Sequence, residues 1–479
     1  MTGFISVRDR QMSLWQSATH EATAGLAESK PGQAAAIRNA ANRSVEDRAA
    51  GQPLTPAVAA RSGPDLAHLS ELFFELGKAQ VAGDAAKVAT LTQAVEAAKR
   101  DYSSDDIKWL TECLKQFNKY YAQGVDPIYR DWKSQPGRNK NFGVITYTFP
   151  ANAKVMLIAD WGTDLTDNVE MLRQGIKHLS PDVIIHLGDV YYSGTEAECT
   201  RNVLNVMDDI FKDGTARIPI FAIPGNHEYY SGGGGFYKMI DQLNVGIPAA
   251  RQKASYFCLR SADGLWQFLG MDTGFDDHDP TSVISLLKRG PELNASEAEW
   301  HQDKIENFLG TTILLSHHQL ISANDPINGP LGIPQFRNNH LFETFQPYFN
   351  RIGAWYWGHE HDFAAFAEYV GLKKPRLIGC GAYEESESGR VGHTFGTDVP
   401  YIPDMPSLGL SDYLTGGKRY YNHAFAMLKF SPGRATKASY YQYPSWDRSF
   451  AGARPDLFDP SLKNPFFTET IPPVRQAGT

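Results

Sequence analysis

The feature that most constrains the fold is a set of short apolar runs between residues 144 and 357. Each run has the length of a strand and contains no charged residue, as expected for strands buried on both faces. The clearest runs are 144–149, 155–158, 183–185, 218–223, 312–315 and 352–357. Helical stretches such as 168–178 and 202–211 separate several of them. This alternation predicts a layered α/β domain whose site lies at the carboxyl ends of its strands.

Further strand-like runs follow later in the chain, at 266–271, 376–379, 425–430 and 439–443. They predict a second sheet that packs on the first. We place this domain at residues 141–445. The segment after it, 446–479, is rich in Pro, Asp and Phe and is expected to be an irregular C-terminal tail.

Five of the apolar runs lead into short islands of potential metal ligands, at 160–162, 188–192, 225–228, 316–318 and 358–361. A single Asp after a strand is usually a turn or cap residue. Two such residues, Asp160 and Asp189, together with an amide and several imidazoles, favour metal binding instead. Asp189 has two carboxylate oxygens and could bridge two ions. His359 and His361 lie two residues apart and could reach different ions.

Taken together and in order, the five islands resemble the calcineurin-like metallophosphoesterase superfamily. Its pattern is Asp-x-His or Asp-x-Gly, Gly-Asp, Gly-Asn-His-Glu/Asp, a His after a strand, and Gly-His-x-His. The resemblance covers about residues 155–365. It implies a four-layer α-β-β-α metallophosphoesterase sandwich, with a dinuclear metal site at the top of the two sheets.

Two details of the islands resemble the purple acid phosphatases within that superfamily. Most members have His two residues after the first Asp, where this chain has Gly162. Tyr192 stands three residues after Asp189, where purple acid phosphatases have a Tyr that binds ferric iron. Alternatively, Tyr191 and Tyr192 only pack within the loop.

The resemblance also implies a division of the ligands between two ions. The first set is Asp160, Asp189, Tyr192 and His361; the second is Asp189, Asn226, His317 and His359. Phenolate and carboxylate ligands suit Fe(III), and the amide with two imidazoles suits Zn(II), Mn(II) or Fe(II). In a reducing cytosol an all-divalent centre is more plausible.

Two further histidines are candidate catalytic residues. In the family that the islands resemble, the residue corresponding to His227 polarises the phosphate and protonates the leaving oxygen. The alternative for His227 is a structural imidazole bound to Asp160 or Asp189. His318 follows His317 and is expected to line the pocket, because neighbouring residues point in opposite directions. Glu228 is expected to orient its loop.

Two loops could border the site. The glycine run 232–235 predicts either a lid or a plain flexible connection. The acidic loop with Asp276, Asp277 and His278 could contact substrate or form a solvated surface.

The N-terminal part of the chain has a different character. Residues 1–63 contain few large apolar residues and predict a mobile, low-complexity segment. Apolar residues at helical spacing between 66 and 76, a helix at about 85–100 and another from 103 predict a helical module at 64–140. We expect a packing appendage, or an element that binds a protein partner.

Composition excludes several function classes. The net charge of −8 on 479 residues argues against broad affinity for nucleic acid. The four cysteines form no CxxC motif, which argues against a thiolate zinc site. No stretch is long enough to span a membrane, and no secretory apolar segment opens the chain as given, so we expect a cytoplasmic protein.

The sequence therefore predicts a dinuclear enzyme that hydrolyses small phosphate monoesters. The islands do not separate this function from a phosphodiesterase acting on cyclic nucleotides or lipid head groups. A third alternative is a non-catalytic scaffold that binds a partner through residues 64–140.

Overall fold

The structure is a computed structural model and describes residues 32, 84–102, 126–135, 139–163, 165–191, 193–212, 216–277, 290–322, 327, 336–381, 401–411, 420–445 and 464–474. The chain divides into two compact units. The first comprises Met1–Gly124 and Asp447–Arg454, and the second comprises Val125–Trp446 and Pro455–Thr479.

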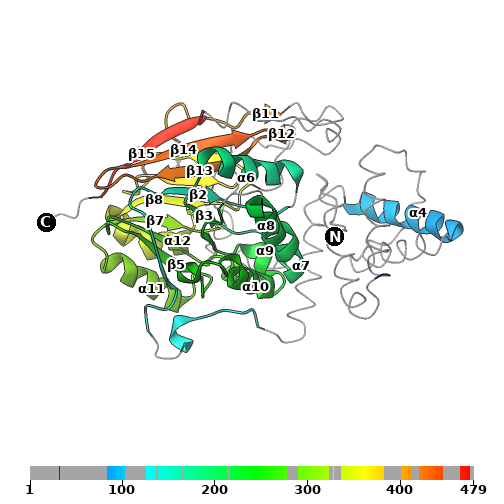
Figure 1. Ribbon diagram of the computed structural model, residues 1–479, viewed down its shortest axis with the longest axis horizontal. Helices are drawn as coiled ribbons and strands as arrows, with labels where there is room; N and C mark the ends of the chain where they lie inside the picture. The colour runs from blue at the N-terminus through cyan, green and yellow to red at the C-terminus, as the bar shows by residue number, and fades with distance from the viewer. Residues whose placement is uncertain are drawn as a thin grey trace. The chain divides into compact units, whose positions relative to one another are not determined.

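The first unit contains helix α4 (Ala85–Tyr102), which is blue in Figure 1. This helix agrees with the one predicted at about 85–100. Its sequence is rich in Ala, which favours helix because the side chain loses no rotamer entropy. The helices expected at 66–76 and from 103 lie outside the described residues, as does the segment 1–63 apart from Gly32. The partner-binding role of the module stays a prediction.

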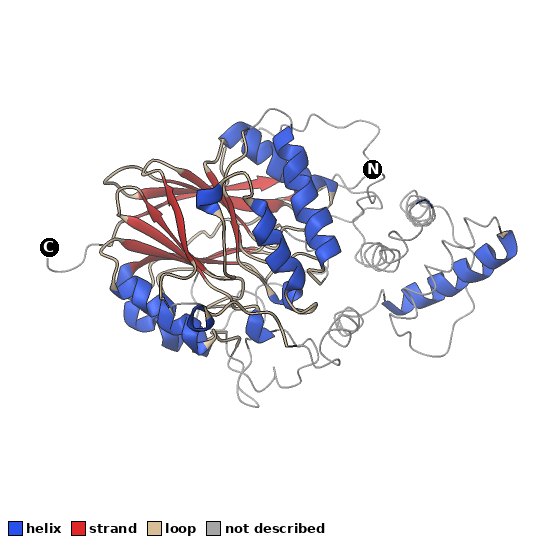
Figure 2. Cartoon of the chain, turned by 60° about the horizontal axis from the view of Figure 1, so that its bottom comes forward, coloured by secondary structure: helices blue, strands red, loops and turns tan. Residues whose placement is uncertain are grey.

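The second unit is built on two sheets that lie between helices (Figure 2). The larger sheet has seven strands in the order β1-β5-β6-β7-β8-β10-β9. Strands β6, β7, β8 and β10 run parallel, and β9 is an antiparallel edge. The strands are β1 (Val144–Phe149), β5 (Phe257–Ser261), β6 (Trp266–Gly270), β7 (Thr311–Leu315), β8 (Ile352–Trp357), β10 (Pro375–Ile378) and β9 (Phe363–Ala365).

The second sheet has six strands in the order β15-β14-β13-β2-β3-β4. Strands β2, β3 and β4 are parallel, and β13, β14 and β15 extend the sheet as antiparallel strands. The strands are β2 (Lys154–Ile158), β3 (Val183–His186), β4 (Ile220–Ala222), β13 (His423–Lys429), β14 (Thr436–Tyr443) and β15 (Phe467–Ile471). A separate short pair joins β11 (Leu410–Ser411) to β12 (Tyr420–Tyr421).

Helices cover the outer face of each sheet (Figures 1 and 2). The six-stranded sheet packs with α6 (Thr166–Leu179), α7 (Glu196–Glu198), the π-helical segment η2 (Cys199–Leu204), α8 (Asn205–Lys212) and α10 (Gly234–Leu243). The seven-stranded sheet packs with α11 (Ala295–Glu306), α12 (Asn339–Phe345) and η6 (Gln346–Arg351). The remaining helical turns are η1 (Trp132–Ser134), α9 (Asn226–Tyr229), η3 (Pro248–Ala250) and η4 (Phe275–Asp277).

The main core lies between the two sheets. Leu157, Ile185 and Phe221 from the six-stranded sheet belong to one buried cluster with Phe268 and Ile313 from the seven-stranded sheet. Because the central strands, such as β3, β7 and β8, are buried along their whole length, their sequences are largely apolar. The predicted α/β fold class, with two sheets flanked by helices, is confirmed for the described residues.

Residues 126–135 pack on this second unit, although the sequence placed them in the helical module. The Trp132 indole donates a hydrogen bond to the Ser296 carbonyl at 2.7 Å, and the Tyr129 hydroxyl donates to Glu297 at 2.6 Å. Arg130 forms an ion pair with Asp241 at 2.8 Å. This segment therefore leads into the sheets along α11 and α10.

The C-terminal segment contains a strand that the sequence did not predict. Strand β15 pairs antiparallel with β14 inside the stretch expected to be irregular. Its Glu469 forms a 2.6 Å ion pair with the buried Arg376 and accepts a hydrogen bond from Tyr440 at 2.7 Å. The polar residues of this strand disguise it in the sequence, because the partner that neutralises Glu469 lies 93 residues away.

No helix among the described residues is both long enough and apolar enough to cross a membrane.

Candidate metal centre

The candidate ligands meet where the carboxyl ends of the two sheets come together. Asp160 follows β2, Asp189 follows β3, and Asn226 begins α9 after β4. His317 follows β7 and His359 follows β8, both in the seven-stranded sheet. The His359 backbone N–H donates to both carboxylate oxygens of Asp160, at 3.2 and 3.0 Å, which joins the two sheets at the site.

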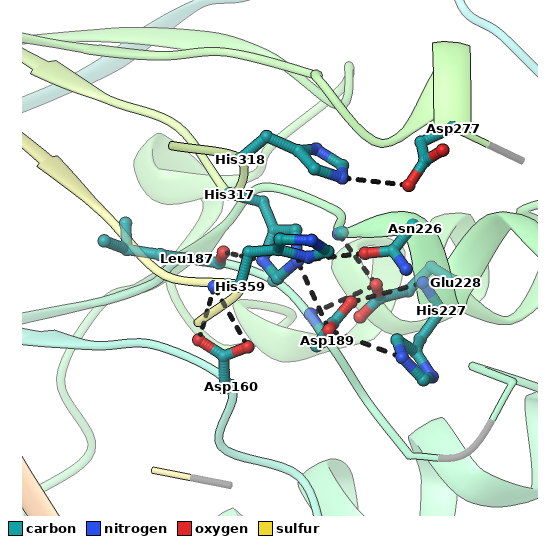
Figure 3. Close-up of polar contacts among 12 residues, drawn as sticks. Asp160, Leu187, Asp189, Asn226, His227, Glu228, Asp277, His317, His318 and His359 are labelled. Atoms are coloured by element: carbon teal, nitrogen blue, oxygen red, sulfur yellow. Dashed lines mark hydrogen bonds and ion pairs between the residues drawn. The ribbon is translucent and has the colours of Figure 1, made fainter. Parts of the chain in front are cut away.

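His317 lies at the middle of this cluster (Figure 3). Its Nδ1 lies 3.0 Å from the Leu187 carbonyl oxygen, which can only accept, so Nδ1 carries a proton. Its Nε2 lies 3.2 Å from Asp189 Oδ2, 3.1 Å from Asn226 Oδ1 and 3.2 Å from His359 Nδ1. These are atoms with lone pairs that converge on one point. A shared cation is what such a donor set fits.

The buried carboxylates of Asp160 and Asp189 also favour a positive charge at this position. Burial lowers the pKa of His317, but the nearby Asp189 and Asp160 outweigh this and raise it to about 9. Burial alone would raise the pKa of Asp189, yet His227, His317 and His359 hold it well below its ordinary value. Two buried carboxylates thus face this position, and a bound metal ion would offset their charge.

A second group of side chains surrounds Asp160. The Tyr191 hydroxyl lies 3.3 Å from Asp160 Oδ1, 3.3 Å from Asp189 Oδ2 and 2.8 Å from His361 Nε2. His361 Nε2 lies 3.8 Å from Asp160 Oδ1. Phenol, carboxylates and imidazole therefore meet at the position where the sequence predicted the first ion.

The tyrosine in this group is Tyr191, whereas the sequence predicted Tyr192 as the ligand. Tyr192 lies outside the described residues, so its assignment stays a prediction. Tyr191 is buried, and its approach to Asp160 and Asp189 is closer than packing within a loop requires. The motif spacing favoured Tyr192, and nothing in the sequence indicated that the hydroxyl of Tyr191 would lie beside Asp160 and Asp189.

The absence of His at Gly162 has a local physical reason. A Cβ at Gly162 would lie 3.0 Å from the Val190 Cα, so a side chain there would push the first and second islands apart. The Tyr191 backbone N–H donates to the Gly162 carbonyl at 3.2 Å. The two loops therefore pack directly on each other, and this packing carries the Tyr191 hydroxyl to Asp160.

Three of the candidate ligands have a left-handed backbone. The φ angles of Asp160, Asp189 and His359 are 57°, 68° and 70°. Such values are uncommon for residues other than glycine, and they concentrate at functional sites because they cost conformational energy. Here the turn at each residue directs its side chain back over the end of the preceding strand.

Two glycines leave the space that the carboxylates occupy. A Cβ at Gly225 would lie 2.1 Å from Asp189 Oδ1, and a Cβ at Gly358 would lie 2.3 Å from Asp160 Oδ2. Any larger residue would displace these oxygens. The backbone of the third and fifth islands therefore forms a cradle for the carboxylates of the first and second, which fits a site built to bind metal.

The ligand atoms form two overlapping groups among the described residues. Within each, the atoms lie within 4.8 Å of one another, and the groups are Asp160, Asp189 and His317, and His317, His318 and His359. The oxygens and imidazoles fit Zn(II), Mn(II) or iron. The second group contains His318, which the sequence assigned to catalysis.

His227 is buried beside the cluster. Its Nε2 lies 3.7 Å from Asp189 Oδ2, and its backbone N–H donates to Asp189 Oδ1 at 3.2 Å. The proximity to Asp189 matches the structural alternative considered for His227, and it also places the imidazole next to the metal position. Both roles stay open on geometry alone.

His318 makes a different set of contacts. Its backbone N–H and its Nδ1 each lie 3.0 Å from Thr273 Oγ1, and its Nε2 lies 3.2 Å from Asp277 Oδ2. The ring centroids of His318 and His359 are 4.5 Å apart. Asp277, one of the acidic-loop candidates, is therefore a partner of His318. His278 lies outside the described residues.

Glu228 ties the second and third islands together. Its carboxylate accepts hydrogen bonds from the backbone N–H groups of Gly225 at 2.8 Å, Val190 at 2.8 Å and Asp189 at 3.2 Å. This matches the orienting role expected for it.

The structure gives no lid at the glycine run: a Cβ at Gly235 would lie 2.1 Å from the Gly194 carbonyl oxygen, so the run packs closely and begins α10.

Residues 153–363 match the family model of the calcineurin-like phosphoesterases, and this part of the chain is therefore a calcineurin-like phosphoesterase domain. The superfamily resemblance carried by the five islands is confirmed. The match spans all of the candidate ligands named above.

Two solved structures also show similarity to this chain. One is GAP50, the anchor in the inner membrane complex of Plasmodium, with a TM-score of 0.40 and 11% identity over 67% of this chain and 88% of that chain. Another is the purple acid phosphatase PPD1 from yellow lupin (Lupinus luteus) seeds, with a TM-score of 0.38 and 12% identity over 64% of this chain and 56% of that chain. No curated protein matches the sequence. Function is therefore argued from the site.

Proposed function

We propose that this chain is a dinuclear metal-dependent phosphohydrolase that cleaves phosphate monoesters, in the manner of purple acid phosphatases. The observation that carries the proposal is the convergence of lone pairs on His317 Nε2 from Asp189, Asn226 and His359. Four elements far apart in the chain bring these atoms together. Structural packing does not require such an arrangement.

The proposed ligands divide into two sets that share Asp189. Asp160, His361 and a tyrosine would hold the first ion, and Asn226, His317 and His359 would hold the second. The geometry around Asp160 supports Tyr191 as a candidate beside the predicted Tyr192. Iron(III) with Zn(II), Mn(II) or Fe(II), or two divalent ions, fits this donor set. Two bound ions would supply a hydroxide nucleophile and neutralise the phosphate oxygens.

The protein side chains supply the remaining chemistry. Asp160 and Asp189 provide the negative charge that retains the ions, and Glu228 fixes the loops that carry Asp189 and Asn226. His227 is proposed to donate a proton to the leaving oxygen, since an imidazole beside the metal position can titrate near neutral pH. His318 and Asp277 are proposed to contact the substrate from the other side.

Metal analysis combined with parallel assays tests the proposal. We expect about two ions per chain after reconstitution, and faster hydrolysis of p-nitrophenyl phosphate than of bis-p-nitrophenyl phosphate. A clear preference for the diester would replace the monoesterase with a phosphodiesterase on the same site. Fewer than one ion per chain, with neither substrate cleaved, would favour a scaffold instead.

A further inference from the structure

We infer that Tyr230 is a positioning residue with two separable tasks: its hydroxyl orients the Asn226 amide toward the second ion, and its ring holds His227 in place. The inference rests on the proposed function and adds a residue to which the metal ligands and the catalytic histidine both owe their orientation. Tyr230 directly follows α9, the single helical turn that carries Asn226 and His227.

The hydroxyl of Tyr230 determines whether the oxygen or the NH2 group of the Asn226 amide points to the site. Asn226 Nδ2 donates to the Tyr230 oxygen at 2.6 Å, while Asn226 Oδ1 faces His317 Nε2 at 3.1 Å. An amide oxygen can bind a metal ion, but the NH2 group cannot. Because Asn226 is buried, its NH2 group needs an acceptor within the protein. Tyr230 supplies that acceptor and thereby keeps the oxygen directed to the ion.

The ring of Tyr230 is one of two tyrosine rings that contact His227. The ring centroids of His227 and Tyr230 are 4.9 Å apart, and those of His227 and Tyr191 are 4.7 Å apart. Both pairs are tilted, at 59° and 54°, which is within the range favoured by aromatic contacts. An imidazole that is held by two rings keeps its nitrogen atoms at fixed positions. A proton donor needs this precision, because transfer requires hydrogen-bond distance.

The neighbouring Tyr229 shows that the two tyrosines have different tasks. Its hydroxyl donates to Asp272 Oδ2 at 2.6 Å, a residue outside the set of candidate ligands. Asp272 in turn accepts from the Phe275 backbone N–H at 3.0 Å. Tyr229 thus anchors α9 to the loop after β6, whereas Tyr230 acts on the residues of the site. Tyr229 is therefore a matched control for Tyr230.

The first test separates the hydroxyl from the ring. In the full chain reconstituted with Zn(II), Tyr230→Phe is expected to weaken one of the two metal-binding steps by about 10- to 100-fold, as measured by competition with a chelating dye. Excess Zn(II) should restore most of the lost turnover. Tyr230→Leu should lose turnover that excess Zn(II) does not restore, because His227 then lacks its contact with the Tyr230 ring.

Tyr229→Phe is the control for the two Tyr230 variants. Tyr229→Phe should lower the unfolding temperature while both metal-binding steps keep their affinities. Unchanged zinc affinity in Tyr230→Phe, or equal weakening in Tyr229→Phe, would overturn the role of the hydroxyl. Equal turnover of Tyr230→Leu and Tyr230→Phe in excess zinc would overturn the role of the ring. If Tyr230→Leu does not fold, Tyr230→Met, which also lacks a ring, replaces it. A parent chain that binds no zinc pair would refute the proposed function instead.

Discussion

The two sheets contribute chemically different halves of the candidate centre. The six-stranded sheet presents oxygen atoms, from Asp160, Asp189 and Asn226, while the seven-stranded sheet presents imidazoles, from His317 and His359. The two halves favour different metal ions, because carboxylate and amide oxygens suit hard ions and imidazoles suit zinc and iron. The centre therefore exists only while the buried interface between the sheets is intact.

The difference teaches how one fold can adjust its metals. Residues of the six-stranded half control charge, since they include both carboxylates. Residues of the seven-stranded half bring neutral nitrogen ligands whose basicity depends on their own hydrogen bonds, such as that from His317 to Leu187. Substitutions in the six-stranded half should alter the charge balance of the site. Substitutions in the seven-stranded half should alter its affinity for the softer ions.

The largest expected effect comes from removing one ligand of each half. Asn226→Ala and His317→Ala should each reduce kcat by roughly 10³-fold or more, because a lost ion removes several kcal/mol of transition-state stabilisation. Steady-state assays and metal analysis of both variants provide the measurement. Circular dichroism should still show folded protein. Retention of full activity in either variant would refute the assignment of that half.

The next effect contrasts the two histidines that flank the ligands. His227→Asn should lower kcat by about 10²- to 10⁴-fold for an alkyl phosphate, whose leaving oxygen needs a proton. The loss should be far smaller for p-nitrophenyl phosphate, whose leaving group departs as a stable anion. His318→Asn should mainly raise KM for both substrates. Equal losses of kcat on the two esters in His227→Asn would exclude its role as general acid.

A smaller effect distinguishes the two tyrosines of the second island. If iron(III) is bound, Tyr191→Phe should abolish the phenolate-to-iron absorption band, and Tyr192→Phe should keep it, because the Tyr191 hydroxyl already lies beside Asp160 and Asp189. In a colourless divalent enzyme, the affinity for the first ion is compared instead and should fall by about tenfold or more in Tyr191→Phe. The reverse pattern would identify Tyr192 as the ligand, as the sequence predicts.

The smallest effect concerns carboxyl groups away from the ligands. Burial raises the pKa of Asp272 to about 7 and that of Glu297 to about 8. At these two carboxyl groups the folded chain therefore binds more protons than the unfolded chain between about pH 4 and pH 8. The stability that they contribute is fully present below about pH 4 and is lost as pH rises through the pKa values of the folded chain, by up to about 1.4 kcal/mol per pH unit for each proton.

Chemical unfolding of the metal-free chain at several pH values measures this slope. Glu297→Gln should flatten it in the range from pH 5 to pH 8, since the amide does not titrate. Asp189 behaves in the opposite way, because the facing imidazoles lower its pKa. An unchanged slope in Glu297→Gln would show that Glu297 does not control the pH dependence of stability.

Much of the fold could be predicted because strands that are covered on both faces must be apolar. The same logic located Asp160, Asp189 and His317, which directly follow such strands. The same reasoning did not predict β15, where the charge of Glu469 is neutralised by Arg376 from a strand that is distant in the sequence. Local pattern carries no information about a partner that only the folded chain provides.

The choice between neighbouring side chains was also beyond the sequence. The motif spacing favours Tyr192, and it gives no indication that the Tyr191 hydroxyl lies 3.3 Å from Asp160 Oδ1. In the same way, Tyr229 and Tyr230 look equivalent in the sequence but contact Asp272 and Asn226 respectively. Adjacent residues diverge according to backbone angles, which motifs do not specify.

The left-handed residues Asp160, Asp189 and His359 affect how an inactive form of this protein should be engineered. Alanine at such a position removes the ligand but keeps a Cβ in a disfavoured conformation, at about 1–2 kcal/mol. Glycine removes the ligand and relieves that strain. A catalytically dead chain is therefore best made as Asp189→Gly, which removes the shared ligand without leaving a Cβ in a disfavoured backbone conformation.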